Sequence, residues 1–154
     1  MALRQGDKAF PFKLSPKIGQ DVDLGGHIGK ENVVLLFIPF AFSPTCTAEV
    51  CHFRDHWRKF ASLNAKVFAI SVDSPFVTDK FRAAESIPYP VLSDFNKEVS
   101  RRYGVLHEDL MGYRGVSKRA VFVIGKDGII KYSWVTEDPR NQIKFDEVEA
   151  ALSS

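Results

Sequence analysis

Residues 39–51 read PFAFSPTCTAEVC, and they mark the point where a buried strand passes into a helix. The apolar run before them, Val33 to Phe40, is typical of a strand buried on both faces. Ser43 then supplies an N-cap, and Pro44 supplies a first helical residue with a preset φ. Cys46 therefore falls in the first helical turn, where unpaired N–H groups and the helix dipole favour an anion. A thiol placed there should ionise more readily, so we expect the chemistry at Cys46.

The bulk composition is that of an ordinary globular protein. The chain has 154 residues, of which 45% are apolar and 26% charged, and its formal net charge is +2. This charge is too small to indicate a nucleic-acid partner, and the longest apolar run, Val33 to Phe42, is too short to cross a membrane. Residues 1–7 contain no hydrophobic signal region, which predicts a cytoplasmic location. Two cysteines in a small cytosolic protein are more often reactive than structural.

The rest of the pattern alternates strands with helices. Strands are expected at residues 10–14, 21–24, 33–40, 66–73, 119–124 and 129–135. Helices are expected at about 44–63, from Ser74 onward, at 95–103 and at 143–152. Residues 88–92 read as an extended stretch, residues 107–117 as a loop, and residues 125–128 as a hairpin turn. We therefore expect one α/β domain over residues 1–154, with an N-terminal β-hairpin and a mixed central sheet flanked by helices.

A set of short motifs runs through the chain in a fixed order. They are Gly6-Asp7-Lys8-Ala9, Pro39-x-x-x-Ser43-x-x-Cys46, Leu92-Ser93-Asp94, Tyr103-Gly104-Val105 and Arg119-Ala120-Val121-Phe122-Val123-Ile124. Together they resemble the peroxiredoxins of the AhpC/TSA superfamily, whose signature is Pro-x-x-x-Thr/Ser-x-x-Cys. The family's usual Ala-Pro-x-Phe appears here as Ala9-Phe10-Pro11-Phe12. The resemblance implies a thioredoxin-like fold and a thiol-dependent peroxidase that uses neither cofactor nor metal.

The resemblance also implies a role for each residue of the signature. Cys46 would attack the peroxide, while the Ser43 hydroxyl and the amides of Thr45 and Cys46 would bind its oxygens. Arg119 would be the partner of Cys46, because a guanidinium stays charged and offers several directed donors. Pro39 would shape the loop and shield the thiolate from water.

Three of the candidate residues also have simpler interpretations. Ser43 could serve as a helix N-cap alone, and an isolated arginine such as Arg119 is more often a surface charge. Glu49 could orient Arg119 through a charge-assisted bond, or it could lie exposed in the first turn and interact with the helix dipole.

Attack on a peroxide turns Cys46 into a sulfenic acid, which condenses with a second thiol. The position of Cys51 resembles the bacterioferritin comigratory protein, or peroxiredoxin Q, subgroup, which implies an intramolecular disulfide recycled by a thioredoxin- or glutaredoxin-like reductant. Five helical residues place the side chains ~140° apart with about 7.5 Å of axial rise. A disulfide tolerates Cα separations only up to roughly 7 Å, so the helix must unwind first. Other segments, such as Ala41-Phe42, resemble the one-cysteine AhpE-type enzymes, in which an external thiol resolves the sulfenic acid.

Other classes of function compete with this interpretation. Cys46, Cys51, His52 and His56 suggest a metal site, but Cys46 lies ~15 Å along a continuous helix from His56, which excludes one shared ion. A thiol–disulfide oxidoreductase normally uses Cys-x-x-Cys. A non-enzymatic chaperone or docking module finds no support in an exposed apolar run. The family resemblance also suggests a homodimer.

Overall fold

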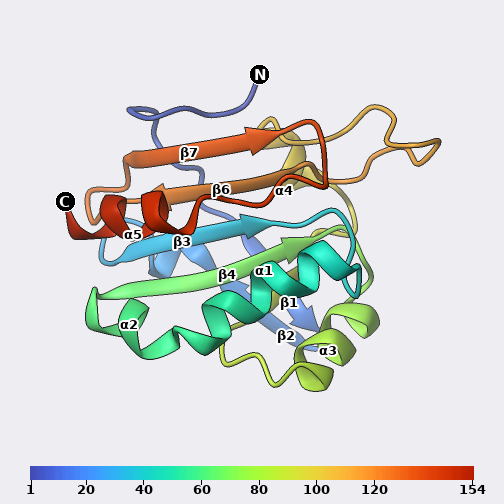
Figure 1. Cartoon of the computed structure of the whole chain (residues 1–154), viewed down its shortest axis with the longest axis horizontal. Helices are drawn as coiled ribbons and strands as arrows, with labels where there is room; N and C mark the ends of the chain where they lie inside the picture. Colours follow the sequence, from blue (N-terminus) through green and yellow to red (C-terminus); the bar gives the residue numbers. More distant parts are fainter.

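A seven-stranded sheet forms the centre of the computed structural model, which describes residues 1–154. Its order is β2-β1-β5-β4-β3-β6-β7 (Figure 1). The strands are β1 Lys13–Lys17, β2 Gln20–Asp23, β3 Asn32–Phe37, β4 Ala65–Ser71, β5 Val91–Ser93, β6 Arg119–Ile124 and β7 Ile130–Thr136. Strand β4 pairs in parallel with β3 and β5, whereas β6 and β7 continue the sheet antiparallel. The predicted mixed sheet with an antiparallel edge hairpin is confirmed.

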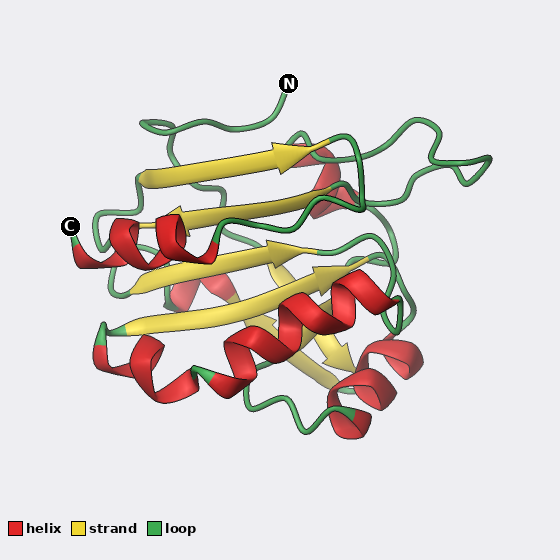
Figure 2. Cartoon of the chain, viewed as in Figure 1, coloured by secondary structure: helices red, strands yellow, loops and turns green.

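Helices cover both faces of this sheet (Figure 2). They are α1 Pro44–Asp55, α2 Trp57–Ser62, α3 Pro75–Ala84, α4 Glu98–Arg102 and α5 Phe145–Ser153, besides a short 3-10 helix at Leu24–Gly26. Helices α1, α2, α3 and α5 contribute to the hydrophobic core on one face, and α4 to the core on the other. Strand β3 contributes side chains to both cores. Val34 and Leu36 lie in the first core, and Val33 and Leu35 lie in the second. This double burial explains its continuous apolar run. None of the helices has the length and apolar character needed to span a membrane.

Several element boundaries differ from the predicted ones. Strand β3 ends at Phe37, because Pro39 has no N–H with which to continue the ladder. The helix expected over 44–63 is broken at His56, where φ is −109° and ψ is 20°, so that α1 and α2 are separate. Strand β1 begins at Lys13 and extends through Pro16 to Lys17, beyond the strand predicted at residues 10–14. The extended stretch at 88–92 leads into a true strand, β5, which pairs with both β4 and β1.

Candidate active site

Helix α1 starts beyond the carboxyl end of β3 and carries Cys46 in its first turn. Ser43 occupies the N-cap position with extended backbone, and Pro44 is the first helical residue, as expected. Cys46 is fully buried. The first bond of the helix runs from the Thr47 amide to the Ser43 carbonyl at 2.9 Å, and the amides of Thr45 and Cys46 make no hydrogen bond within the chain. Two backbone donors therefore remain available beside the sulfur.

Arg119 lies at the start of β6, which pairs with β3, and its side chain reaches the Cys46 sulfur. Its Nη2 donates to Cys46 Sγ at 3.3 Å, and its Nη1 donates to Glu49 Oε1 at 3.2 Å. Its Nε and Nη2 both donate to the Pro139 carbonyl, at 3.1 and 2.9 Å. A guanidinium has five N–H donors, so these four contacts leave one N–H of Nη1 free. Arg119 is only 1% exposed and is not a surface charge.

Glu49 is fully buried against Arg119, which excludes the exposed first-turn position. Its Oε2 has no hydrogen-bond partner. Burial raises the pKa of Glu49 to about 7, although the charge of Arg119 and its hydrogen bond act in the opposite direction. A carboxyl group with this pKa takes up a proton near neutrality.

The raised pKa of Glu49 predicts that its contribution to stability falls as pH rises. Between the ordinary glutamate pKa of 4.5 and the raised pKa of about 7, the folded chain binds more protons at this site than the unfolded chain. The free energy of unfolding therefore decreases with pH over that window and levels off above it. Going from pH 5 to pH 8, the Glu49→Gln variant should gain roughly 2–3 kcal/mol of stability relative to the wild type. Urea unfolding of both proteins at each pH measures this difference.

The difference between the unfolding free energies of the wild type and Glu49→Gln at each pH isolates the contribution of Glu49 from those of other titrating groups. Burial lowers the pKa of His52 and His107, and these histidines contribute a pH dependence of the opposite sign to both proteins. Parallel stability curves for wild type and Glu49→Gln would contradict the assignment.

A cavity of about 170 Å³ lies in front of the Arg119 side chain. Four of the predicted site residues line it: Pro39, Ser43, Thr45 and Arg119. The Ser43 hydroxyl makes no bond to the helix and instead donates to the Phe40 carbonyl at 3.0 Å. The Ser43 side chain therefore does not cap the helix, and its oxygen keeps its acceptor capacity. Cys46 itself does not line the cavity, and Arg119 connects the two because it lines the cavity and contacts the buried thiol.

Sequence reasoning missed the opposite wall of this cavity, which consists of Leu110, Met111, Pro139 and Arg140. The first two belong to the segment 107–117, which was interpreted only as a loop. Pro139 also acts on Arg119 through its backbone carbonyl, an atom that every residue type has. No signal in the sequence distinguishes it.

Asp73, which follows the end of β4, also supports the site, and it was not among the predicted site residues. Its Oδ2 accepts from the Ala41 amide at 2.8 Å and from the Ser71 hydroxyl, so the carboxylate anchors the loop between β3 and α1. The signal available was a Ser-x-Asp motif at the carboxyl end of a parallel strand, where sites in open α/β sheets form.

Cys51 lies about 1.4 helical turns beyond Cys46 in α1, and both thiols are free. Its Sγ donates to Glu85 Oε1 at 3.4 Å. Burial and this hydrogen bond raise the pKa of Cys51. Because both cysteines belong to the continuous helix α1, they are not positioned to form a disulfide in this conformation.

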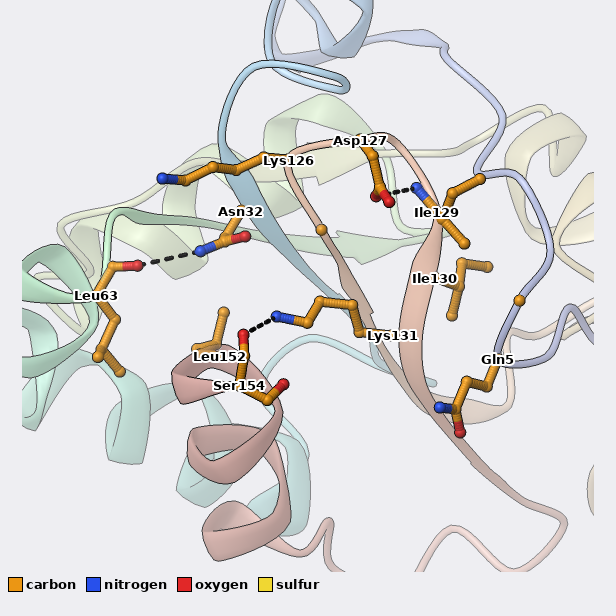
Figure 3. Close-up of a pocket in the computed structure, with 12 residues that line it drawn as sticks. Gln5, Asn32, Leu63, Lys126, Asp127, Ile129, Ile130, Lys131, Leu152 and Ser154 are labelled. Carbon is orange, nitrogen blue, oxygen red and sulfur yellow. Dashed lines mark hydrogen bonds between the residues drawn. The ribbon is translucent and has the colours of Figure 1, made fainter.

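A second and larger cavity, of about 780 Å³, contains none of the predicted site residues. It lies near the start of β3 and the turn between β6 and β7 (Figure 3). Lys131 spans part of it to the Ser154 carbonyl at 2.7 Å, and Asn32 donates to the Leu63 carbonyl at 3.2 Å. No cysteine lines either cavity, but the smaller one is lined by Arg119, whose Nη2 contacts Cys46 Sγ at 3.3 Å.

The fold and the buried cysteine held by an arginine define a thiol-based enzyme of the thioredoxin-like class. The AhpC/TSA family model matches residues 5–133. The chain belongs to this family.

Known relatives agree with that assignment. The chloroplastic 2-cysteine peroxiredoxin of Chattonella marina var. antiqua is 36% identical over 145 residues, covering 88% of this chain and 72% of that protein. The chain spans about half the length of two other chloroplastic relatives. Alkyl hydroperoxide reductase E of Mycobacterium tuberculosis is 35% identical over 157 residues, covering 99% of each chain. The crystal structure of peroxidoxin BcpB from Mycobacterium tuberculosis matches with a TM-score of 0.86 at 32% identity, over 98% and 97% of the two chains. The predicted thioredoxin-like fold is confirmed, and the chain is a peroxiredoxin-type, thiol-dependent peroxidase.

Proposed function

We propose that Cys46 is the nucleophile with which this peroxidase reduces hydrogen peroxide and organic hydroperoxides. The observation that carries the proposal is the 3.3 Å contact from Arg119 Nη2 to Cys46 Sγ in the first turn of α1. A directed cation and a helix N-terminus both favour the thiolate, which is the reactive form of cysteine. The lining of the adjacent cavity by Ser43 and Thr45 supports the same role.

The proposed reaction transfers one oxygen to sulfur. The Cys46 thiolate attacks one peroxide oxygen, the O–O bond breaks, and the sulfur loses two electrons to become a sulfenic acid. The second oxygen leaves with the bonding electron pair and takes a proton, giving water or an alcohol. The free N–H of Arg119 and the amides of Thr45 and Cys46 would stabilise the charge on that oxygen, and the Ser43 hydroxyl would orient the substrate. Pro39 would keep water from the thiolate.

We propose further that Cys51 resolves the sulfenic acid. The Cys51 sulfur bonds to the Cys46 sulfur, the S–O bond breaks, and the hydroxyl leaves as water with the thiol proton. Helix α1 must first unwind, and the contact between Cys51 and Glu85 must break. A thioredoxin- or glutaredoxin-like dithiol would then reduce the disulfide. The alternative is that an external thiol resolves the sulfenic acid. The hydrogen bond from Cys51 to Glu85 favours this route, because it holds the Cys51 thiol away from Cys46.

The Cys51→Ser variant separates these two routes. After one equivalent of peroxide the wild type should lose both free thiols and the mass of two hydrogens. Cys51→Ser should react at the same initial rate but gain the mass of one oxygen, and it should pass on to sulfinic acid under excess peroxide. Thiol titration and intact mass spectrometry measure both outcomes. A wild type that stops at a sulfenic acid, with Cys51 still open to alkylation, would instead establish the external-thiol route.

Residues 1–154 would work as one domain, in the cytoplasm and as a homodimer. Phe42, Met111 and Tyr113 are 50%, 77% and 60% exposed, and they lie on or next to segments that line the active-site cavity. Apolar side chains of this size at one edge of the site support a dimer contact there.

A further inference from the structure

One short segment makes three hydrogen bonds to the part of α1 that carries Cys51. This segment, Glu85–Tyr89, connects α3 to β5 and is called the clamp segment below. The Glu85 carboxylate accepts from Cys51 Sγ at 3.4 Å, and the Glu85 carbonyl accepts from Arg54 Nη1 at 2.8 Å. The Tyr89 hydroxyl donates to the Val50 carbonyl at 2.6 Å. The second and third turns of α1 are therefore fixed to a neighbouring segment as well as by their own helical bonds.

Tyr89 is held firmly enough to serve as an anchor. It is 1% exposed and packs on Trp57, with 5.6 Å between the ring centroids. It stands between Pro88 and Pro90, which restrict the backbone on either side. Burial raises the pKa of its hydroxyl, so Tyr89 remains a donor throughout the working pH range. If α1 unwound, this buried donor would lose its partner, and that loss adds to the cost of opening.

We propose that the clamp segment, with Tyr89 as its main positioning residue, controls the opening of α1 and thereby selects how the Cys46 sulfenic acid is resolved. This choice between two routes of resolution rests on the function proposed above. An internal disulfide requires Cys51 to leave Glu85 and α1 to unwind. While the clamp holds, the sulfenic acid reacts with an external thiol or a second peroxide. When it releases, the thiol of Cys51 reaches Cys46, a disulfide forms and water leaves.

The Tyr89→Phe variant tests the opening directly in the reduced full-length protein. It removes one hydroxyl and keeps the ring. Tyr103→Phe is a matched control, because Tyr103 is also fully buried and donates to a backbone carbonyl, that of Phe10, at 2.7 Å in the other core. Amide hydrogen exchange over residues 50–55 and alkylation of Cys51 should both become about fivefold faster in Tyr89→Phe, the size expected for one hydrogen bond. Glu85→Ala should also speed alkylation of Cys51, because it removes the carboxylate contact and keeps the carbonyl contact with Arg54.

The pattern of exchange decides whether the effect is local. Exchange in β3 should stay at the wild-type rate in Tyr89→Phe. Unchanged exchange in residues 50–55, an equal rise in Tyr103→Phe, or a uniform rise that includes β3 would each overturn the proposal.

Oxidation tests the selection separately. With one equivalent of peroxide, Tyr89→Phe should close the disulfide about fivefold faster, and with excess peroxide it should accumulate less sulfinic acid. A faster opening with an unchanged disulfide rate would overturn the selection. A third result is a rise of amide exchange in Tyr89→Phe while neither the wild type nor the variant forms a disulfide. That result would support the clamp on α1 and contradict the proposed resolving role of Cys51.

Discussion

We expect the Cys46→Ser variant to show no measurable turnover of hydrogen peroxide. A serine hydroxyl is not ionised near neutral pH and cannot replace a thiolate as the attacking group. Loss of a nucleophile without replacement costs at least about a thousandfold in rate. The measurement is peroxide consumption by the purified protein with a dithiol reductant and no added metal.

Cys51→Ser is the matched control for this result, because it removes a thiol from the same helix. It should still reduce one equivalent of peroxide at the wild-type rate. Far-ultraviolet circular dichroism of both variants verifies that the fold persists. More than a trace of activity in Cys46→Ser would remove Cys46 from the chemistry and leave Cys51 as the thiol to consider.

Arg119→Met should slow the reaction of Cys46 with peroxide by roughly 10²–10³-fold. The substitution removes the donor to the Cys46 sulfur and the one N–H of Arg119 that has no partner in the chain, and loss of an oxyanion-hole donor has an effect of this magnitude. Arg119→Lys keeps the charge but cannot contact Cys46, Glu49 and the Pro139 carbonyl together, so it should recover only part of the rate. Stopped-flow tryptophan fluorescence under excess reduced enzyme measures the rate constant.

Stability must be separated from chemistry in this experiment. Removing Arg119 alone leaves Glu49 buried without its cation, and breaking a buried pair costs about 3–5 kcal/mol. The double variant Arg119→Met with Glu49→Gln removes both charges and should recover most of that stability. If it also recovers the rate, Arg119 acts through the fold. If the rate stays low in a stable protein, Arg119 acts on the reacting atoms.

The sequence predicted the core of the site because strong local signals coincide there. A continuous apolar run, a proline at the first helical position and a cysteine two residues later define β3, α1 and the place of Cys46. Strand β6 was predicted at its observed bounds, since its apolar run is flanked by Lys118 and a glycine turn.

Other features leave weaker traces in the sequence. Strand β5 has three residues and follows Pro90, so it lacks the length of a strand signal. The break between α1 and α2 at His56 contains no glycine or proline, so no helix-breaking residue marks it in the sequence. The contact of Arg119 with the Pro139 carbonyl depends on how the chain returns after β7, which no residue type encodes.

That contact makes loop length after β7, rather than side-chain identity, the property that places the Pro139 carbonyl on Arg119. The Thr136 hydroxyl accepts from the Asp138 amide at 3.2 Å and from Asn141 Nδ2 at 2.9 Å, which closes the loop around residue 139. Any residue at position 139 offers the same carbonyl, so substitutions there are nearly silent for the guanidinium. An insertion or deletion between residues 136 and 141 would move that oxygen and turn Arg119 away from the sulfur. The reactivity of a thiol in α1 is thus tied to the spacing of a loop at the opposite end of the sequence.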